Sequence, residues 1–186
     1  NTALGYQALK NNSGGYYNTA VGKETLLSMT SGQNNTAVGH NAGEFATTTD
    51  GSVFIGYLAG QGITGTKLTG NDNIAIGTNA GLLLQGAATR NTLVGAYAGD
   101  AITAGDQNTA HGWGALGAGA ATYYNTAIGA SSLAADTTGR HSVAVGLSAL
   151  GAQNTTGSAN MYNVAVGSGA GSSVSTGYQS TYIGGN

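Results

Sequence analysis

Apolar and polar residues alternate over short stretches that return about every 17 residues along the chain. Each stretch ends at a glycine, which we call the anchor glycine and number as position 0. Position −3 is β-branched in all eleven copies, position −2 is alanine in eight, and position −1 is aliphatic in ten. Alternation with β-branched residues at every second place predicts a short strand rather than a helix. The anchor glycines are Gly5, Gly22, Gly39, Gly56, Gly77, Gly95, Gly112, Gly129, Gly146, Gly167 and Gly184.

The spacing of the anchor glycines predicts how the strands are arranged. Successive spacings are 17, 17, 17, 21, 18, 17, 17, 17, 21 and 17 residues. Such regularity is typical of a solenoid, in which one unit buries its apolar surface only against its neighbours. We therefore expect an all-β parallel solenoid of about eleven coils of about 17 residues each. In each coil a strand ends in a tight bend at the anchor glycine, and a small-residue segment and a polar turn complete the coil. Residues 1–186 form a single repeat domain in this interpretation, and we expect them to be a segment of a longer protein.

The alternation also divides each strand into two faces. Positions −3 and −1 share one face, whereas positions −4, −2 and 0 share the other. We expect the aliphatic residues at −1 to form a ladder inside the coil. The small residues of the other face then allow close approach, either across a flattened coil or to another chain. Because parallel strands are commonly buried on both sides, this pattern favours an oligomer.

Composition narrows the function classes. Only 6% of the residues are charged and the formal net charge is −2, so no basic surface for nucleic acid is expected. The chain has no cysteine, which excludes disulfides and thiolate metal sites, and no proline. The chain contains no run of about 18 apolar residues, so the sequence predicts no membrane-spanning segment. Neither composition nor motif indicates a cofactor.

The repeated phrase resembles a known group of surface proteins. "NTAVG", "NIAIG", "SVAVG" and "NVAVG", each followed by a small residue three places on, resemble the head repeats of YadA-like trimeric autotransporter adhesins. They are still more similar to the "NTAVGYQAL" arrays of phage tail fibres. The resemblance covers nearly the whole chain and implies a left-handed parallel β-roll, a homotrimer, and attachment to a surface receptor or polysaccharide. It places the protein on an extracellular surface or in a virion.

A catalytic interpretation finds little support in the acidic residues, most of which fall in variable turns. Asp50 and Asp106 occupy the same column, six residues before their anchor glycines. They are separated by three coils, or about 14 Å at the spacing of parallel strands. A glycosidase pair needs carboxyl groups about 5 to 9.5 Å apart. We therefore expect no enzyme, with a carbohydrate-degrading tail spike as the alternative.

Two further hypotheses concern the strand columns themselves. His111 replaces the aliphatic residue at −1 in one copy. We interpret it as a core histidine, with an ion held by three copies at a threefold axis as the alternative. The threonines at −3 raise a third function, an ice-binding solenoid, if that column is flat and exposed to solvent.

Candidate ligand-binding residues lie where the repeat varies. The position after the anchor glycine carries Tyr57 and Trp113, whose rings suit stacking on a glycan or packing between chains. Two insertions, at 61–72 ("QGITGTKLTGND") and 151–162 ("GAQNTTGSANMY"), account for the 21-residue spacings and predict surface loops. The first insertion contributes Lys67 and Asp72 as further receptor or glycan candidates.

Overall fold

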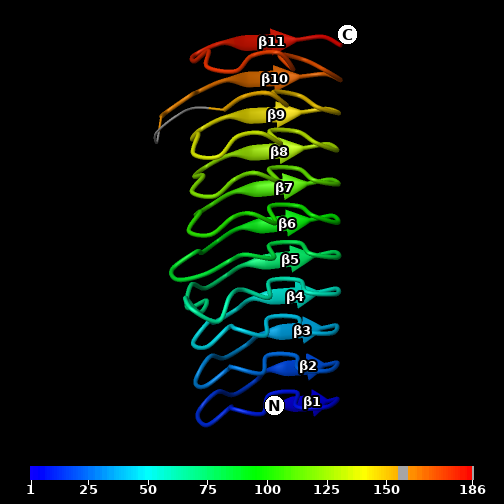
Figure 1. Ribbon diagram of the computed structural model, residues 1–186, viewed down its shortest axis with the longest axis vertical. Helices are drawn as coiled ribbons and strands as arrows, with labels where there is room; N and C mark the ends of the chain where they lie inside the picture. Colours follow the sequence, from blue (N-terminus) through cyan, green and yellow to red (C-terminus); the bar gives the residue numbers. More distant parts are fainter. Residues whose placement is uncertain (155–158, 186) are drawn as a thin grey trace.

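The computed structural model describes residues 1–154 and 159–185, which form a parallel β-solenoid with no helix in this part of the chain. Each coil contributes one three-residue strand, and the strands form one sheet in chain order (Figure 1). No segment of the described residues is a helix long and apolar enough to cross a membrane. The strands are β1 (Thr2–Leu4), β2 (Thr19–Val21), β3 (Thr36–Val38), β4 (Val53–Ile55), β5 (Ile74–Ile76), β6 (Thr92–Val94), β7 (Thr109–His111), β8 (Thr126–Ile128), β9 (Val143–Val145), β10 (Val164–Val166) and β11 (Thr181–Ile183).

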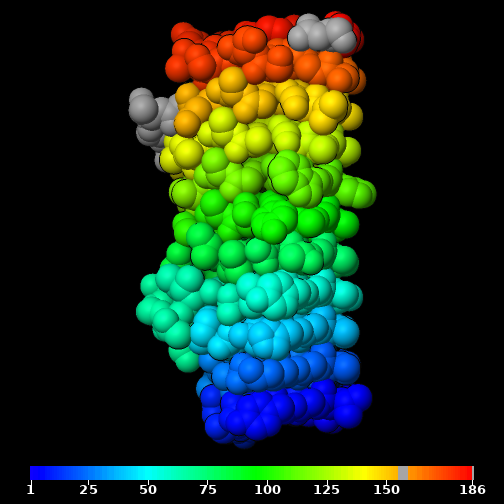
Figure 2. Space-filling view, turned by 45° about the vertical axis from the view of Figure 1, so that its right-hand side comes forward, coloured from blue at the N-terminus to red at the C-terminus, as the bar shows by residue number. Residues whose placement is uncertain are grey.

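The register of the sheet follows the repeat without a slip. Thr36 of β3 pairs with Val53 of β4, and Val53 pairs with Ile74 of β5, although the second step spans four more residues than the first. The extra residues leave the coil as a loop, seen as the teal bulge beside β4 and β5 in Figures 1 and 2. An insertion therefore changes the outline of the rod and not its ladder. Because parallel strands lie about 4.8 Å apart, ten steps give a rod roughly 48 Å long.

The other half of each described coil is built from turns and contains no regular strand. Only isolated parallel bridges form there, for example between Asp106 and Tyr123. Backbone groups still bond from coil to coil: the N–H of Leu26 donates to the carbonyl of Ala42 (3.0 Å), and Leu133 donates to Ala149 (3.0 Å). Leu26 and Leu133 have φ of 49°, in the left-handed region. This conformation turns the chain sharply and leaves no room for a regular second strand.

The interior of the coil is filled by two columns whose volumes compensate each other. Position −2 points inward and is fully buried from β2 to β10, as at Ala20 and Phe54. Position +4 faces it from the returning chain. Where −2 is alanine, +4 is often leucine, as at Leu26 and Leu133, both fully buried. Beside Phe54 the +4 residues are Gly43 and Gly60, where an added Cβ would strike the phenyl ring. The core is thus one large side chain thick. That side chain comes from position −2 in some coils and from position +4 in others.

The aliphatic residues at −1 lie outside the coil, which corrects the expectation that they line its interior. Val38 and Ile55 are each 37% exposed and Ile128 is 40% exposed. His111 in the same column is exposed as well, so it is not a core histidine. The narrow interior explains this arrangement, because it accepts alanine opposite leucine and has no space for a second β-branched column.

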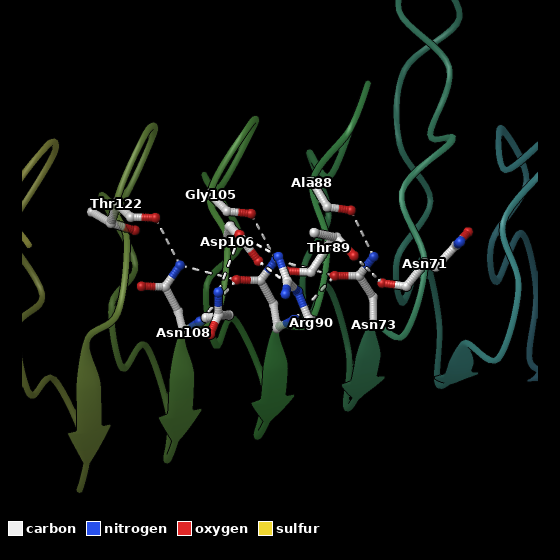
Figure 3. Close-up of polar contacts among 11 residues, drawn as sticks. Asn71, Asn73, Ala88, Thr89, Arg90, Gly105, Asp106, Asn108 and Thr122 are labelled. Carbon is white, nitrogen blue, oxygen red and sulfur yellow. Dashed lines mark hydrogen bonds and ion pairs between the residues drawn. The ribbon is translucent and has the colours of Figure 1, made fainter.

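Side-chain amides at position −4 form a second ladder beside the backbone ladder. Oδ1 of Asn91 accepts from the backbone N–H of Asn108 (3.2 Å) and from its Nδ2 (2.9 Å). The same Nδ2 donates to the carbonyl of Thr122 in the following coil (2.8 Å). Figure 3 shows the amides of Asn73 and Asn108 in this row. The asparagines are buried, so each amide satisfies backbone groups that the turn leaves without a partner.

The anchor glycines allow successive coils to approach at the end of each strand. Gly95 has a φ of +132°, a value that residues with a Cβ rarely adopt. A Cβ built on Gly95 would lie 2.6 Å from the carbonyl oxygen of Gly112 in the next coil. Position 0 therefore has two independent requirements for glycine: its own backbone conformation, and the adjacent backbone.

These two requirements can be separated by substitution. We expect Gly95→Ala to lower the free energy of unfolding by about 3 kcal/mol or more, because strain and a backbone clash add. Gly184→Ala is the matched control, since Gly184 has a φ of +121° but no atom within 4 Å of the added Cβ. It should cost only the strain, about 1–2 kcal/mol. Denaturant unfolding followed by circular dichroism measures both, and equal losses would contradict the close-approach argument.

Candidate functional site

The outward face of the ladder is a regular surface that extends over all eleven strands of the described residues. It consists of positions −3 and −1 of the eleven strands, and we call it the ladder face. Threonine, valine and isoleucine make up most of it, and it contains no Asp, Glu, Lys or Arg, with His111 as its one polar ring. Most of these side chains are half-buried, and exposure rises at the two ends, to 67% at Leu4 and 80% at Ile183. Large exposed apolar surfaces are typical of interaction sites, which makes the ladder face a candidate.

Tyr57 and Trp113 both point to solvent from the corner that follows the strand. Their side chains are 52% and 60% exposed. The Tyr57 ring stacks on His40, with centroids 5.6 Å apart, whereas Trp113 meets Tyr97 edge to face at 6.3 Å. Three coil steps separate Tyr57 from Trp113, or about 14 Å. The two aromatic residues therefore belong to different local surfaces.

Lys67 and Asp72 lie in the loop of the first insertion, on the side of the coil that precedes the strand. Lys67 is exposed, and its Nζ donates to Oγ of Ser28 (3.3 Å). The backbone N–H of Asp72 donates to the carbonyl of Asp50 (2.9 Å), which fixes the end of the loop. Figure 1 shows this loop on the side of the rod opposite the corner that follows the strands. Tyr57 and Trp113 directly follow the anchor glycines Gly56 and Gly112 at that corner. The structure thus does not bring the four candidates together into one site.

The acidic pair considered for catalysis is engaged in the scaffold. Oδ1 of Asp50 accepts from the backbone N–H of Gln33 (2.8 Å). Asp106 forms an ion pair with Arg90, with Oδ2 and Nη2 2.7 Å apart. Figure 3 shows Arg90 and Asp106 beside the asparagine ladder. Within residues 1–154 and 159–185, no three acidic or histidine side chains gather as a metal site would require.

The second insertion contributes to the interior rather than only to the surface. Residues 155–158 of this insertion lie outside the described residues. Before them, Gln153 is fully buried and its Nε2 donates to Oδ2 of Asp136 (2.7 Å) and to Oγ of Ser142 (3.1 Å). Its Oε1 accepts from Nδ2 of Asn163 (2.8 Å). Ser142 interrupts the asparagine ladder, and Gln153 supplies the amide that is missing there. Sequence reasoning missed this role, although a serine at −4 beside a glutamine is a visible signal.

Burial raises the pKa of the Asp136 carboxyl above its usual value of 3.8, against hydrogen bonds from Gln153, Gly139 and Thr138 that lower it. The hydrogen bond from the N–H of Gly139 measures 2.7 Å. A carboxyl with a raised pKa binds its proton more tightly in the folded state than in the unfolded state. Its contribution to stability is therefore complete below the unfolded pKa and is lost as the pH rises through the folded pKa.

A second feature that sequence reasoning missed is a stack of rings at the turn before the strand. His141 lies between Tyr124 and Tyr162, with centroids 4.9 and 5.0 Å away and the rings within about 11° of parallel. The guanidinium of Arg140 lies 4.5 Å from the centroid of Tyr123. All these residues come from neighbouring coils at the same two positions. The stack therefore reinforces the coil-to-coil contact.

The third missed feature is a hollow of about 330 Å³ at the corner after β6 and β7. We call it the corner hollow. Its walls are Tyr97, Asp100 and Trp113, and its base is formed by Gly114 and Gly117 with parts of the next coil. Of these residues the sequence pointed only to Trp113. The signal that identifies the rest is a coil with glycine at both +2 and +5, next to a coil with tyrosine and aspartate at the same positions.

Comparison with protein-family models, with curated proteins and with solved structures found no match. The assignment of function therefore depends on the geometry of the chain and on the resemblance of its repeat.

The buried carboxyl gives a prediction for stability against pH. Asp136→Asn keeps the shape of the side chain and removes its titration. We expect the stability of the natural chain, measured relative to this variant, to fall as the pH rises from 4 to 7. Denaturant unfolding at both pH values tests the difference. A natural chain that gains stability relative to the variant over this range would contradict a raised pKa at Asp136.

Proposed function

We propose that this chain is a structural segment of a homotrimeric surface-attachment fibre, of the adhesin-head or phage tail-fibre type. The observation that carries the proposal is the ladder face. In this assembly the ladder faces of three copies meet along a common axis. The fibre then presents its corners and insertion loops to the surroundings, where three copies of a weak site act together through avidity.

The chemistry of the ladder face supports a second copy as its cover. Parallel sheets are normally buried on both sides, yet in the single chain only the inner side is covered. Interfaces of permanent oligomers are apolar and poor in charged residues. The ladder face has that composition along all eleven strands, and His111 is its one titratable residue. A copy of the same chain offers the same repeat distance, so its side chains match the face at every coil.

The resemblance of the repeat to YadA-like heads and tail-fibre arrays adds the number of copies and the attachment role. The geometry contributes something that the resemblance does not. Continuous hydrogen bonding from coil to coil, by backbone and by asparagine amides, suits a rod that must withstand shear and proteolysis. A fibre of this kind needs no catalytic group, and the acidic pair considered above is engaged with its neighbours.

A second candidate function, ice binding, is favoured by the exposure of the same face. The −3 column points outward, and seven of its eleven residues are threonine. Six of them form two runs of three, in β1–β3 and β6–β8, within which neighbouring threonines are about 4.8 Å apart. The aliphatic −1 column beside them is bulkier than a second threonine row. The two functions differ in what covers the ladder face: a copy of the chain, or ordered water.

The mass of the chain in solution distinguishes these functions. We expect sedimentation equilibrium to give about 55 kDa, three times 18.2 kDa. Val145→Glu places a charge on the ladder face and should shift the mass to that of a monomer, because burying an unpaired charge costs several kcal/mol. Ser173→Glu is the control, since Ser173 is exposed on the returning half of the coil. A natural chain that is monomeric at every concentration contradicts the trimer, and thermal hysteresis by that monomer favours ice binding.

A further inference from the structure

The corner hollow combines two aromatic walls with one carboxylate. Tyr97 and Trp113 stand at 68° to each other with centroids 6.3 Å apart, so they form a corner rather than a stack. They remain 40% and 60% exposed. Asp100 lines the same space, and its Oδ1 would lie 3.5 Å from a Cβ added to Gly117. The carboxylate oxygen thus reaches over the base of the hollow.

The hollow exists because one coil lacks side chains that the neighbouring coils have. Position +2 is Tyr97 in the coil of β6, Gly114 in the next, and Ser131 after that. Position +5 runs Asp100, Gly117 and Ala134 through the same coils. A Cβ on Gly114 would meet no atom within 4 Å. The corner after each strand is the side that Figure 2 turns forward, away from the loop of the first insertion.

The carboxylate in the hollow forms no ion pair within the described residues. The ion pairs of residues 1–154 and 159–185 are Lys23 with Glu24 and Arg90 with Asp106, so Asp100 is in neither. Burial raises the pKa of the Asp100 carboxyl, against backbone hydrogen bonds from Asp100 and Ala101 that lower it. A carboxylate beside two aromatic faces gains most from a ligand that is cationic and apolar at its surface.

We propose that the corner hollow binds a quaternary ammonium group of the choline type, with Tyr97 and Trp113 contacting its methyl groups and Asp100 opposing its charge. Cations of this kind are recognised by aromatic walls, and a nearby carboxylate adds a charge that the neutral rings lack. The proposal rests on the proposed attachment function, since it names the chemistry that the fibre recognises. The site itself lies within one chain.

A sugar ring fits the same hollow less well. A pyranose needs several hydrogen-bonding side chains around its hydroxyl groups as well as an aromatic face. The base of the hollow is Gly114, Gly117 and Ala134, which offer no polar side chain. Only Asp100 and Ser131 supply such groups apart from the two aromatic residues. We therefore expect Trp113 to contact a cationic group of the ligand rather than a sugar ring.

The chain offers a direct probe of binding, because Trp113 is its only tryptophan. Titration of the full chain with choline should change the Trp113 fluorescence to saturation. The neutral isostere 3,3-dimethylbutan-1-ol has the same shape without the charge, and we expect it to bind at least about tenfold more weakly. Asp100→Asn should reduce this preference for choline. Equal binding of the two compounds, or tighter binding of a methyl pyranoside, would overturn the proposal.

A variant that fills the corner hollow tests whether choline binds there. Gly117→Leu places in the hollow a residue that the same column already carries at Leu27 and Leu82, and it should abolish the response to choline. Ser172→Leu makes a comparable change in this column three coils away and should leave the response intact. Circular dichroism verifies that both variants fold. A Gly117→Leu chain that is folded and still binds choline would overturn the assignment.

The outcome is separable from that of the mass measurement. A monomer that binds choline with the stated preference supports the corner hollow and contradicts the trimer. A trimer that shows no choline-dependent change in Trp113 fluorescence supports the fibre and overturns the corner hollow.

Discussion

The whole structure depends on one constraint: each coil must place its backbone within hydrogen-bonding distance of the next, in register. The anchor glycine meets this constraint at the end of the strand, where Gly95 leaves 2.6 Å between a would-be Cβ and the carbonyl oxygen of Gly112. The amide of Asn108 meets it at the beginning, by joining three successive coils. Because the glycine contact recurs along the rod and the amide contact recurs in most coils, the rod holds together with an interior that is only one large side chain thick. Phe54 illustrates the limit, since its ring is accommodated only by glycine at Gly43 and Gly60.

Much of this scaffold follows from the sequence. The spacing of the anchor glycines predicts the parallel solenoid. The direction of the faces does not follow, because alternation fixes which residues share a face but not which face points inward. Val38 and Ile55 are therefore outside, although an aliphatic column suggests a core. What decides is the width of the coil, which is a property of the turns. Leu26, with φ in the left-handed region, shows how tightly those turns close, and no single-residue pattern indicates this.

The candidate sites differ in predictability for the same reason. Trp113 attracts attention as the only tryptophan, and it does line the corner hollow. The residues that make the hollow a site, Asp100 and Gly117, belong to different coils and become neighbours only through stacking. Gln153 is a similar case, since it serves the ladder interrupted at Ser142. In a repeat structure the regular positions build the frame, and specific chemistry arises where irregular positions of adjacent coils coincide.

In the proposed fibre, copies of the chain meet through the ladder face, and distances between labels on different chains report on this contact. The chain has no cysteine, so Val145→Cys carries a single nitroxide label in the middle of that face. We predict that pulsed electron paramagnetic resonance detects a short, well-defined distance between labels on different chains. A label at Ser173→Cys, on the returning half of the coil, should give longer distances. The absence of any inter-chain distance at Val145, or a shorter one at Ser173, would contradict the account.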